Sequence, residues 1–151
     1  HFDHITAVPE LIEKYGKDIK IYASEAERSL LESVDLNCSA MVDNPVSVSA
    51  DIYVNDGDII EEAGLKFKVI ATPGHTIGSV CYYIEDGNVL FSGDTLFEMS
   101  VGRTDLPTGN GAALSESIIS KLFVLPGEVN VYPGHGAQTD IAFERLNNMY
   151  V

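Results

Sequence analysis

The chain has 151 residues, 45% of them hydrophobic, which is enough for one domain with a buried core and too short for two. Nine lysines and arginines against 23 aspartates and glutamates give a formal charge of −14. This argues against nucleic-acid binding, which depends on Lys and Arg, and no apolar run approaches the roughly 20 residues that cross a bilayer.

Hydrophobic periodicity and turn residues predict alternating helices and strands. Residues 8–15 carry Pro9 near the start and Gly16 after the end, as helices do. Ser24 and Glu27 predict a capping box for the next helix, and Asp86-Gly87 predicts a hairpin turn. In chain order we expect a helix over 8–15, a strand over 20–23, a helix over 24–33, a loop over 34–50, strands from 52, over 59–63, 65–72, 79–84 and 89–92, a helix over 111–125, a strand over 129–132 and a helix over 140–147.

Histidine and aspartate recur beside the predicted turns. The chain begins His1-Phe2-Asp3-His4, and later segments are Thr72-Pro73-Gly74-His75, Ser92-Gly93-Asp94-Thr95 and Tyr132-Pro133-Gly134-His135-Gly136. We expect all four histidines at strand-end turns, where glycine lets the backbone bend sharply and approach a site. A single His beside an Asp is more typical of a surface or capping pair. The joint pattern favours a metal site.

The candidate metal ligands are His1, Asp3, His4, His75, Asp94 and His135. Their side chains are imidazoles and carboxylates without a thiolate, which favours zinc, with iron or manganese as alternatives. Six ligands are too many for one tetrahedral zinc and about right for two metals.

The cysteines, Cys38 and Cys81, form no C-x-x-C motif, and Cys81 is expected as a buried apolar residue. This usage of cysteine favours a reducing cytoplasm.

Taken together, these motifs resemble the metallo-β-lactamase superfamily over essentially the whole chain. The first four residues resemble the second half of its His-x-His-x-Asp-His signature. The resemblance implies an α+β fold, an αββα sandwich, as a single partial domain over 1–151. We expect the chain to be truncated before His1, with the family's first strands missing. It also implies ligand roles: His1 and His75 for a first metal, Asp3, His4 and His135 for a second, and Asp94 as the bridge.

The residues around Asp94 resemble the compact glyoxalase II-like hydrolases. They have Asp94 rather than Cys as the bridge, followed by Gly102-Arg103-Thr104-Asp105. This implies a hydroxyacylglutathione hydrolase-like enzyme that cleaves S-lactoylglutathione or a similar small thioester with a hydroxide held between two zinc ions. Asp3 and Asp94 would be catalytic, and Arg103 and Gly134 would contact substrate. A structural loop closed by an Arg103–Asp105 salt bridge is an equal alternative.

Two other hypotheses stay open. Persulfide dioxygenases share the Gly-Arg-Thr-Asp segment, which would mean one iron ion. A first metal site lacking its first histidine would favour a mononuclear second site, or a metal-deficient, non-catalytic fragment. The expected partner is a small-molecule thioester, with no nucleic acid and no membrane. A homo-oligomer or a strand-swapped dimer is also left open.

Overall fold

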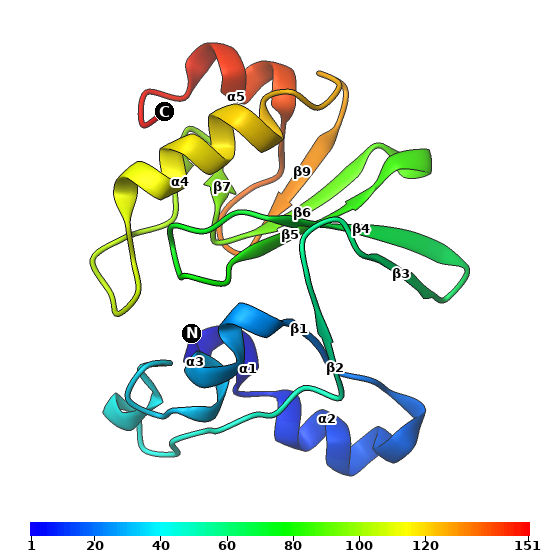
Figure 1. Cartoon of the computed structure of the whole chain (residues 1–151), viewed down its shortest axis with the longest axis vertical. Helices are drawn as coiled ribbons and strands as arrows, with labels where there is room; N and C mark the ends of the chain where they lie inside the picture. Colours follow the sequence, from blue (N-terminus) through cyan, green and yellow to red (C-terminus); the bar gives the residue numbers. More distant parts are fainter. The chain divides into compact units, whose positions relative to one another are not determined.

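The computed structural model describes the whole chain except the side chain of Lys17. It divides into two compact units, His1–Val54 and Asn55–Val151 (Figure 1). We call them unit 1 and unit 2 and describe each by itself. Within the described residues, no helix is long and apolar enough to span a bilayer. The single-domain organisation expected over 1–151 stays a prediction.

Unit 1 consists of short helices and one pair of parallel strands. Its small core contains Ile5, Val46 and Val48. The strands pair in parallel with Tyr22 opposite Ile52. In chain order the elements are α1 (Phe2–Ile5), α2 (Val8–Tyr15), η1 (Gly16–Asp18), β1 (Tyr22–Ser24), η2 (Glu25–Glu27), α3 (Arg28–Glu32), η3 (Ser39–Met41) and β2 (Ile52–Val54).

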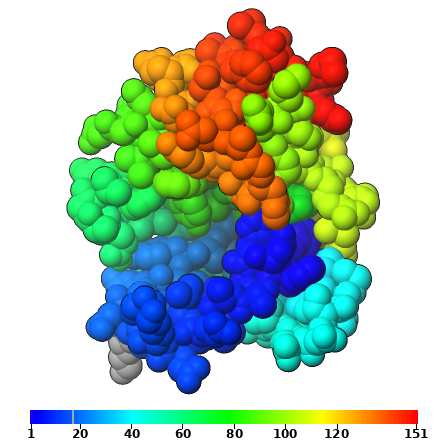
Figure 2. All heavy atoms as spheres, turned by 180° about the vertical axis from the view of Figure 1, so that it is seen from behind, coloured from blue at the N-terminus to red at the C-terminus, as the bar shows by residue number. Residues whose placement is uncertain are grey.

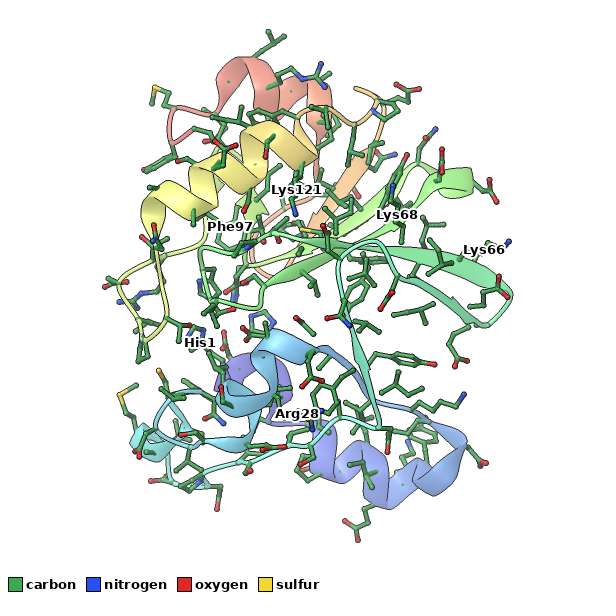
Figure 3. All side chains as sticks on the ribbon, viewed as in Figure 1. His1, Arg28, Lys66, Lys68, Phe97 and Lys121 are labelled. Carbon is green, nitrogen blue, oxygen red and sulfur yellow. The ribbon has the colours of Figure 1, made fainter. Side chains whose placement is uncertain are left out.

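Two predictions for unit 1 are wrong. His1 and His4 do not follow strands, because His1 is the N-cap of α1 and His4 lies on that helix. The capping box of Ser24 and Glu27 does not hold. Ser24 precedes the 3-10 turn η2 and forms no side-chain capping bond to it, and α3 starts only at Arg28. Arg28, labelled in Figure 3, instead bonds to Glu25 at 2.9 Å. The helix over 8–15 is confirmed as α2.

The segment 34–50 is a loop, as predicted, apart from η3. The buried side chain of Asn37 stabilises it. Its Nδ2 donates to the carbonyl of Val46 at 2.9 Å, and its Oδ1 accepts from the backbone N–H of Ser39 at 2.8 Å. These bonds satisfy backbone groups of a loop that lacks a sheet ladder.

Unit 2 is built on a six-stranded sheet with the order β10-β9-β6-β5-β4-β3. Neighbouring strands are antiparallel except for β6 and β9, which are parallel. The strands are β3 (Ile59–Glu62), β4 (Leu65–Ala71), β5 (Val80–Ile84), β6 (Val89–Gly93), β9 (Asn130–Pro133) and β10 (Thr139–Asp140).

Two helices, α4 (Gly111–Ser117) and α5 (Ile141–Asn147), lie on one face of this sheet (Figure 1). Leu114, Ile118 and Ile141 from the helical segments pack on Cys81 and Val131 of the strands. Burial raises the pKa of the Cys81 thiol to about 11. Cys81 is therefore a buried thiol with little thiolate at neutral pH, and the prediction of a buried apolar role is confirmed.

Three details of unit 2 differ from the predictions. The helix expected over 111–125 ends as α4 at Ser117 and continues as a π-helical turn, η5 (Ile118–Leu122). The hairpin between β5 and β6 turns through η4 (Glu85–Gly87), and Asn88, with φ 49°, takes the left-handed conformation expected of glycine. The small hairpin of β7 (Leu96–Phe97) and β8 (Ser100–Val101) and the edge strand β10 were missed, because two-residue strands carry no alternation pattern.

Candidate metal centre

His75 follows β4 through a turn that packs directly on α4. A Cβ atom added at Gly74 would collide with the backbone of Leu114, so this position admits only glycine. The carbonyl of Gly74 accepts from the backbone N–H of Asn110 at 2.7 Å, and the carbonyl of Pro73 accepts from Ser117 Oγ at 2.8 Å. The end of β4 is thereby held at a fixed place against the helix.

The imidazole of His75 is buried, and one of its nitrogens is already committed. Its Nδ1 lies 2.7 Å from the carbonyl oxygen of Arg103. A carbonyl oxygen can only accept, so Nδ1 carries a proton and donates it. Such a bond orients a metal-binding imidazole and leaves Nε2 for the metal.

Asp94 lies between the two histidines of unit 2. Its Oδ2 is 3.5 Å from Nε2 of His75 and 3.5 Å from Nε2 of His135. The side chain follows Gly93, which has a φ of 51°, and is 13% exposed. A Cβ atom at Gly102 would collide with the carbonyl oxygen of Asp94. Glycine at this position therefore lets the loop that carries Arg103 pass close to Asp94.

His135 follows β9, the parallel neighbour of β6. The register sets Gly93 opposite Pro133, and the N–H of Gly134 donates to the carbonyl of Gly93 at 2.8 Å. The ladder therefore brings the residues after both strands together. The side chain of His135 is 53% exposed, and its segment, coloured orange, lies at the surface in Figure 2.

These three side chains fit a divalent metal. They converge two imidazole nitrogens on one carboxylate oxygen, a donor set suited to zinc or iron. Two ligands bound at about 2.0 to 2.1 Å to one tetrahedral ion lie about 3.3 Å apart. The observed 3.5 Å is close to that separation and longer than a typical N–H···O bond.

The other three predicted ligands belong to unit 1. His1 caps α1, and Asp3 Oδ2 lies 3.6 Å from Nε2 of His4 on that helix. Asp3 and His4 are exposed, and His1 is partly buried. Their assignment as ligands, and that of Asp3 as a catalytic residue, stays a prediction from the sequence motif.

The loop after β8 uses Arg103 in a way that the sequence did not indicate. Its guanidinium forms two bonds to the carboxylate of Asp105, at 2.6 and 2.7 Å, and both side chains are exposed. This pair holds the pKa of Asp105 down at about 2. The salt bridge is as predicted, but it is the main-chain carbonyl of Arg103 that reaches His75. Substrate contacts by Arg103 and Gly134 stay predictions.

Phe97 was also missed. Its ring meets the His135 ring edge-on, with centroids 6.1 Å apart and an interplanar angle of 88°. Phe97, labelled in Figure 3, ends β7, and its role depends on a hairpin that has no sequence signal.

The arrangement of ligands after the strands of one mixed sheet defines the class of protein. Residues 1–135 match the model of the metallo-β-lactamase superfamily, and the chain belongs to this family. The predicted α+β metallo-β-lactamase fold is confirmed. The fold implies a divalent metal, which the donor set in unit 2 suits.

Similar proteins narrow the class further. The chain is 39% identical over 153 residues to the probable metallo-hydrolase YqgX of Bacillus subtilis, covering 100% of the chain and 72% of YqgX. It is 32% identical over 154 residues to the hydroxyacylglutathione hydrolase GloC of Haemophilus influenzae, covering 100% of the chain and 72% of GloC.

Two solved structures are also similar. The B3 metallo-β-lactamase BLEG-1 has a TM-score of 0.91 at 38% identity, covering 99% of the chain and 72% of that structure. TTHA1623 in a di-iron-bound form has a TM-score of 0.84 at 35% identity, covering 100% and 73%. The chain is thus a member of a metallo-hydrolase superfamily whose relatives differ in activity and metal.

Proposed function

We propose that this protein is a zinc-dependent thioesterase of the glyoxalase II type, acting on S-lactoylglutathione or a similar small thioester. The observation that carries this proposal is the carboxylate of Asp94, with His75 and His135 each 3.5 Å from its Oδ2. A carboxylate at the bridging position is the feature by which the sequence resembles glyoxalase II enzymes. The similarity to GloC, at 32% identity, supports the same substrate class.

A divalent metal supplies Lewis acidity: it lowers the pKa of a water molecule toward 7 and polarises a carbonyl oxygen. His75 would bind through Nε2, with its ring oriented by the carbonyl of Arg103. Asp94 would contribute negative charge from a side chain that is only 13% exposed, and His135 would bind at the solvent-exposed side.

The remaining proposed roles come from the sequence motifs. His1, Asp3 and His4 would supply further ligands, and Asp3 would accept a proton from the attacking water. Gly134, exposed beside His135, would leave room for the substrate. The partner is then a small-molecule thioester.

The test is a metal analysis combined with a substrate panel, on protein whose N-terminus has been verified by intact mass. Elemental mass spectrometry should find zinc, and the zinc-loaded protein should hydrolyse S-lactoylglutathione well above a β-lactam, included because BLEG-1 is similar. Preferred cleavage of the β-lactam, or zinc without thioester cleavage, would contradict the proposed substrate.

An iron enzyme is the second candidate, because TTHA1623 holds two iron ions at 35% identity. About one iron ion per chain in the purified protein, with oxygen consumption on a persulfide, would favour the dioxygenase alternative. If neither metal binds, the non-catalytic alternative is favoured.

A further inference from the structure

Glu144, on α5, is a completely buried carboxylate outside the group formed by His75, Asp94 and His135. A buried charge is tolerated only when hydrogen bonds replace its hydration. Its Oε1 accepts from Thr139 Oγ1 at 2.6 Å, and its Oε2 accepts from the N–H of Met99 at 3.0 Å and from Asn148 Nδ2 at 2.8 Å. Both oxygens of the Glu144 side chain are therefore hydrogen-bonded, which offsets the loss of their hydration.

One of these donors holds the small hairpin of β7 and β8. Met99 lies in its turn with a φ of 51°, a conformation that is uncommon for a residue with a side chain. The bond from its N–H to Glu144 stabilises that turn. Asn148 strengthens the same attachment, because its Nδ2 also donates to the carbonyl of Ser100 at 3.0 Å. Phe97, which precedes the turn, is the residue whose ring meets His135.

A second donor holds the segment on the other side of His135. Thr139 begins β10, four residues after His135, and pairs with Val131 of β9. The residues between His135 and Thr139, 136–138, are exposed (Figure 2). The bond from Thr139 to Glu144 therefore anchors the end of an exposed segment that begins at the histidine.

We propose that Glu144 is a positioning residue for His135. By binding Met99 it keeps the Phe97 ring in its T-shaped contact with the imidazole, and by binding Thr139 it holds the chain that leads away from the imidazole. Together these contacts orient Nε2 of His135 toward Asp94. The metal-affinity part of this inference rests on the proposed function, whereas the part about ring orientation stands on the metal-free protein.

The test compares Glu144→Gln with two controls. Glutamine keeps the shape but replaces one acceptor oxygen by an amide donor that faces N–H and O–H donors. Ile141→Val, at a fully buried position of the same helix, controls for lost stability, and Glu116→Gln, at an exposed position of α4, controls for lost charge. The measurements are the NMR signals of the His135 ring, hydrogen exchange at the Met99 amide, and the zinc Kd, all well below the unfolding temperature.

Glu144→Gln should move the His135 ring signals toward those of Phe97→Leu, remove protection of the Met99 amide, and weaken zinc binding about tenfold. Neither control should do so. Unchanged ring signals with a fall in Tm like that of Ile141→Val would overturn the inference and leave Glu144 a purely structural residue. Should Glu144→Gln fail to fold, Thr139→Val, which removes one donor at nearly constant shape, takes its place under the same criteria.

A wild-type protein that binds no zinc would contradict the proposed function. The NMR and exchange measurements on the metal-free protein would then still decide the role of Glu144.

Discussion

In unit 2, His75, Asp94 and His135 each follow a strand of one six-stranded sheet, whereas in unit 1 Asp3 and His4 lie on a helix of four residues. Among the described residues, the hydrophobic cluster of unit 2 contains eleven buried residues and that of unit 1 contains three. Strands joined by ladders place the residues at their ends with little freedom, while a single helical turn is marginal without packing. The ligands of unit 2 therefore sit on the better-supported framework.

Unit 1 compensates partly with polar contacts. The buried amide of Asn37 and the hydroxyl of Ser39 both bond to the carbonyl of Val46. Such a network specifies one conformation when every polar group in it is hydrogen-bonded, but removing one partner leaves a buried polar group unsatisfied and lowers the stability. We thus expect substitutions in the two units to act differently on metal binding and on stability.

The largest effect is expected at the centre of unit 2. Asp94→Ala removes the oxygen that lies near both His75 and His135, so the protein should lose metal. Its kcat/KM should fall by more than about 100-fold, because replacing a residue that only supports a metal ligand already costs about 10- to 100-fold. Elemental mass spectrometry and steady-state hydrolysis measure both. Asp86→Ala, an exposed aspartate of unit 2, is the control. Full metal content in Asp94→Ala would remove Asp94 from the ligand list.

Histidine substitutions compare the two units directly. His135→Ala should lower the metal content by about one ion per chain, because it removes an imidazole from the observed donor group. His4→Ala should lower it equally if the sequence motif of unit 1 supplies a ligand to the same ion. Metal analysis of both variants at matched protein concentration decides this. A full complement in His4→Ala would restrict the centre to unit 2.

Core substitutions measure how unevenly the two units are stabilised. Ile118→Ala, at a fully buried position of unit 2, should lower the free energy of unfolding by about 4 kcal/mol, and Ile5→Ala in unit 1 by about 2 kcal/mol, within the known range for this change. Urea denaturation followed by circular dichroism gives both values. Equal losses would mean that the small core of unit 1 is packed as tightly as the large one.

The smallest effect is expected at Arg103. Arg103→Ala should leave metal content unchanged, because His75 bonds to the main-chain carbonyl at this position. It should raise the pKa of Asp105 from about 2 toward its ordinary value of about 3.9. NMR titration of the Asp105 carboxyl measures the pKa, and metal loss would assign a direct role to the guanidinium.

The pH dependence of this pair follows from the depressed pKa. The stability that Asp105 contributes is present above its unfolded pKa, about 3.9, and is lost as the pH falls toward about 2. Because both side chains are exposed, this contribution is small and should weaken with added salt.

Local signals explain which elements were predictable. Pro9 and Gly16 bound α2 from within its own sequence, and the prediction is confirmed. The capping box at Ser24 was wrong because α3 starts four residues later than its pattern indicates. The turn before β6 was assigned to Gly87, but Asn88 takes the left-handed conformation, since asparagine also tolerates it.

For the candidate metal centre, too, some features were predictable from local sequence signals and others were not. By itself the sequence determined the longer strands of unit 2, β3 to β6 and β9, and which turns carry His75, Asp94 and His135, because strand patterns and Gly-containing turns are local properties. The family followed from the resemblance of its His and Asp motifs. Only the tertiary structure decided that the Arg103 carbonyl orients His75, that Phe97 meets His135, and that Glu144 holds both segments beside it. These contacts join residues as many as 45 positions apart, and side chains leave no periodic signal for a partner so distant in the chain.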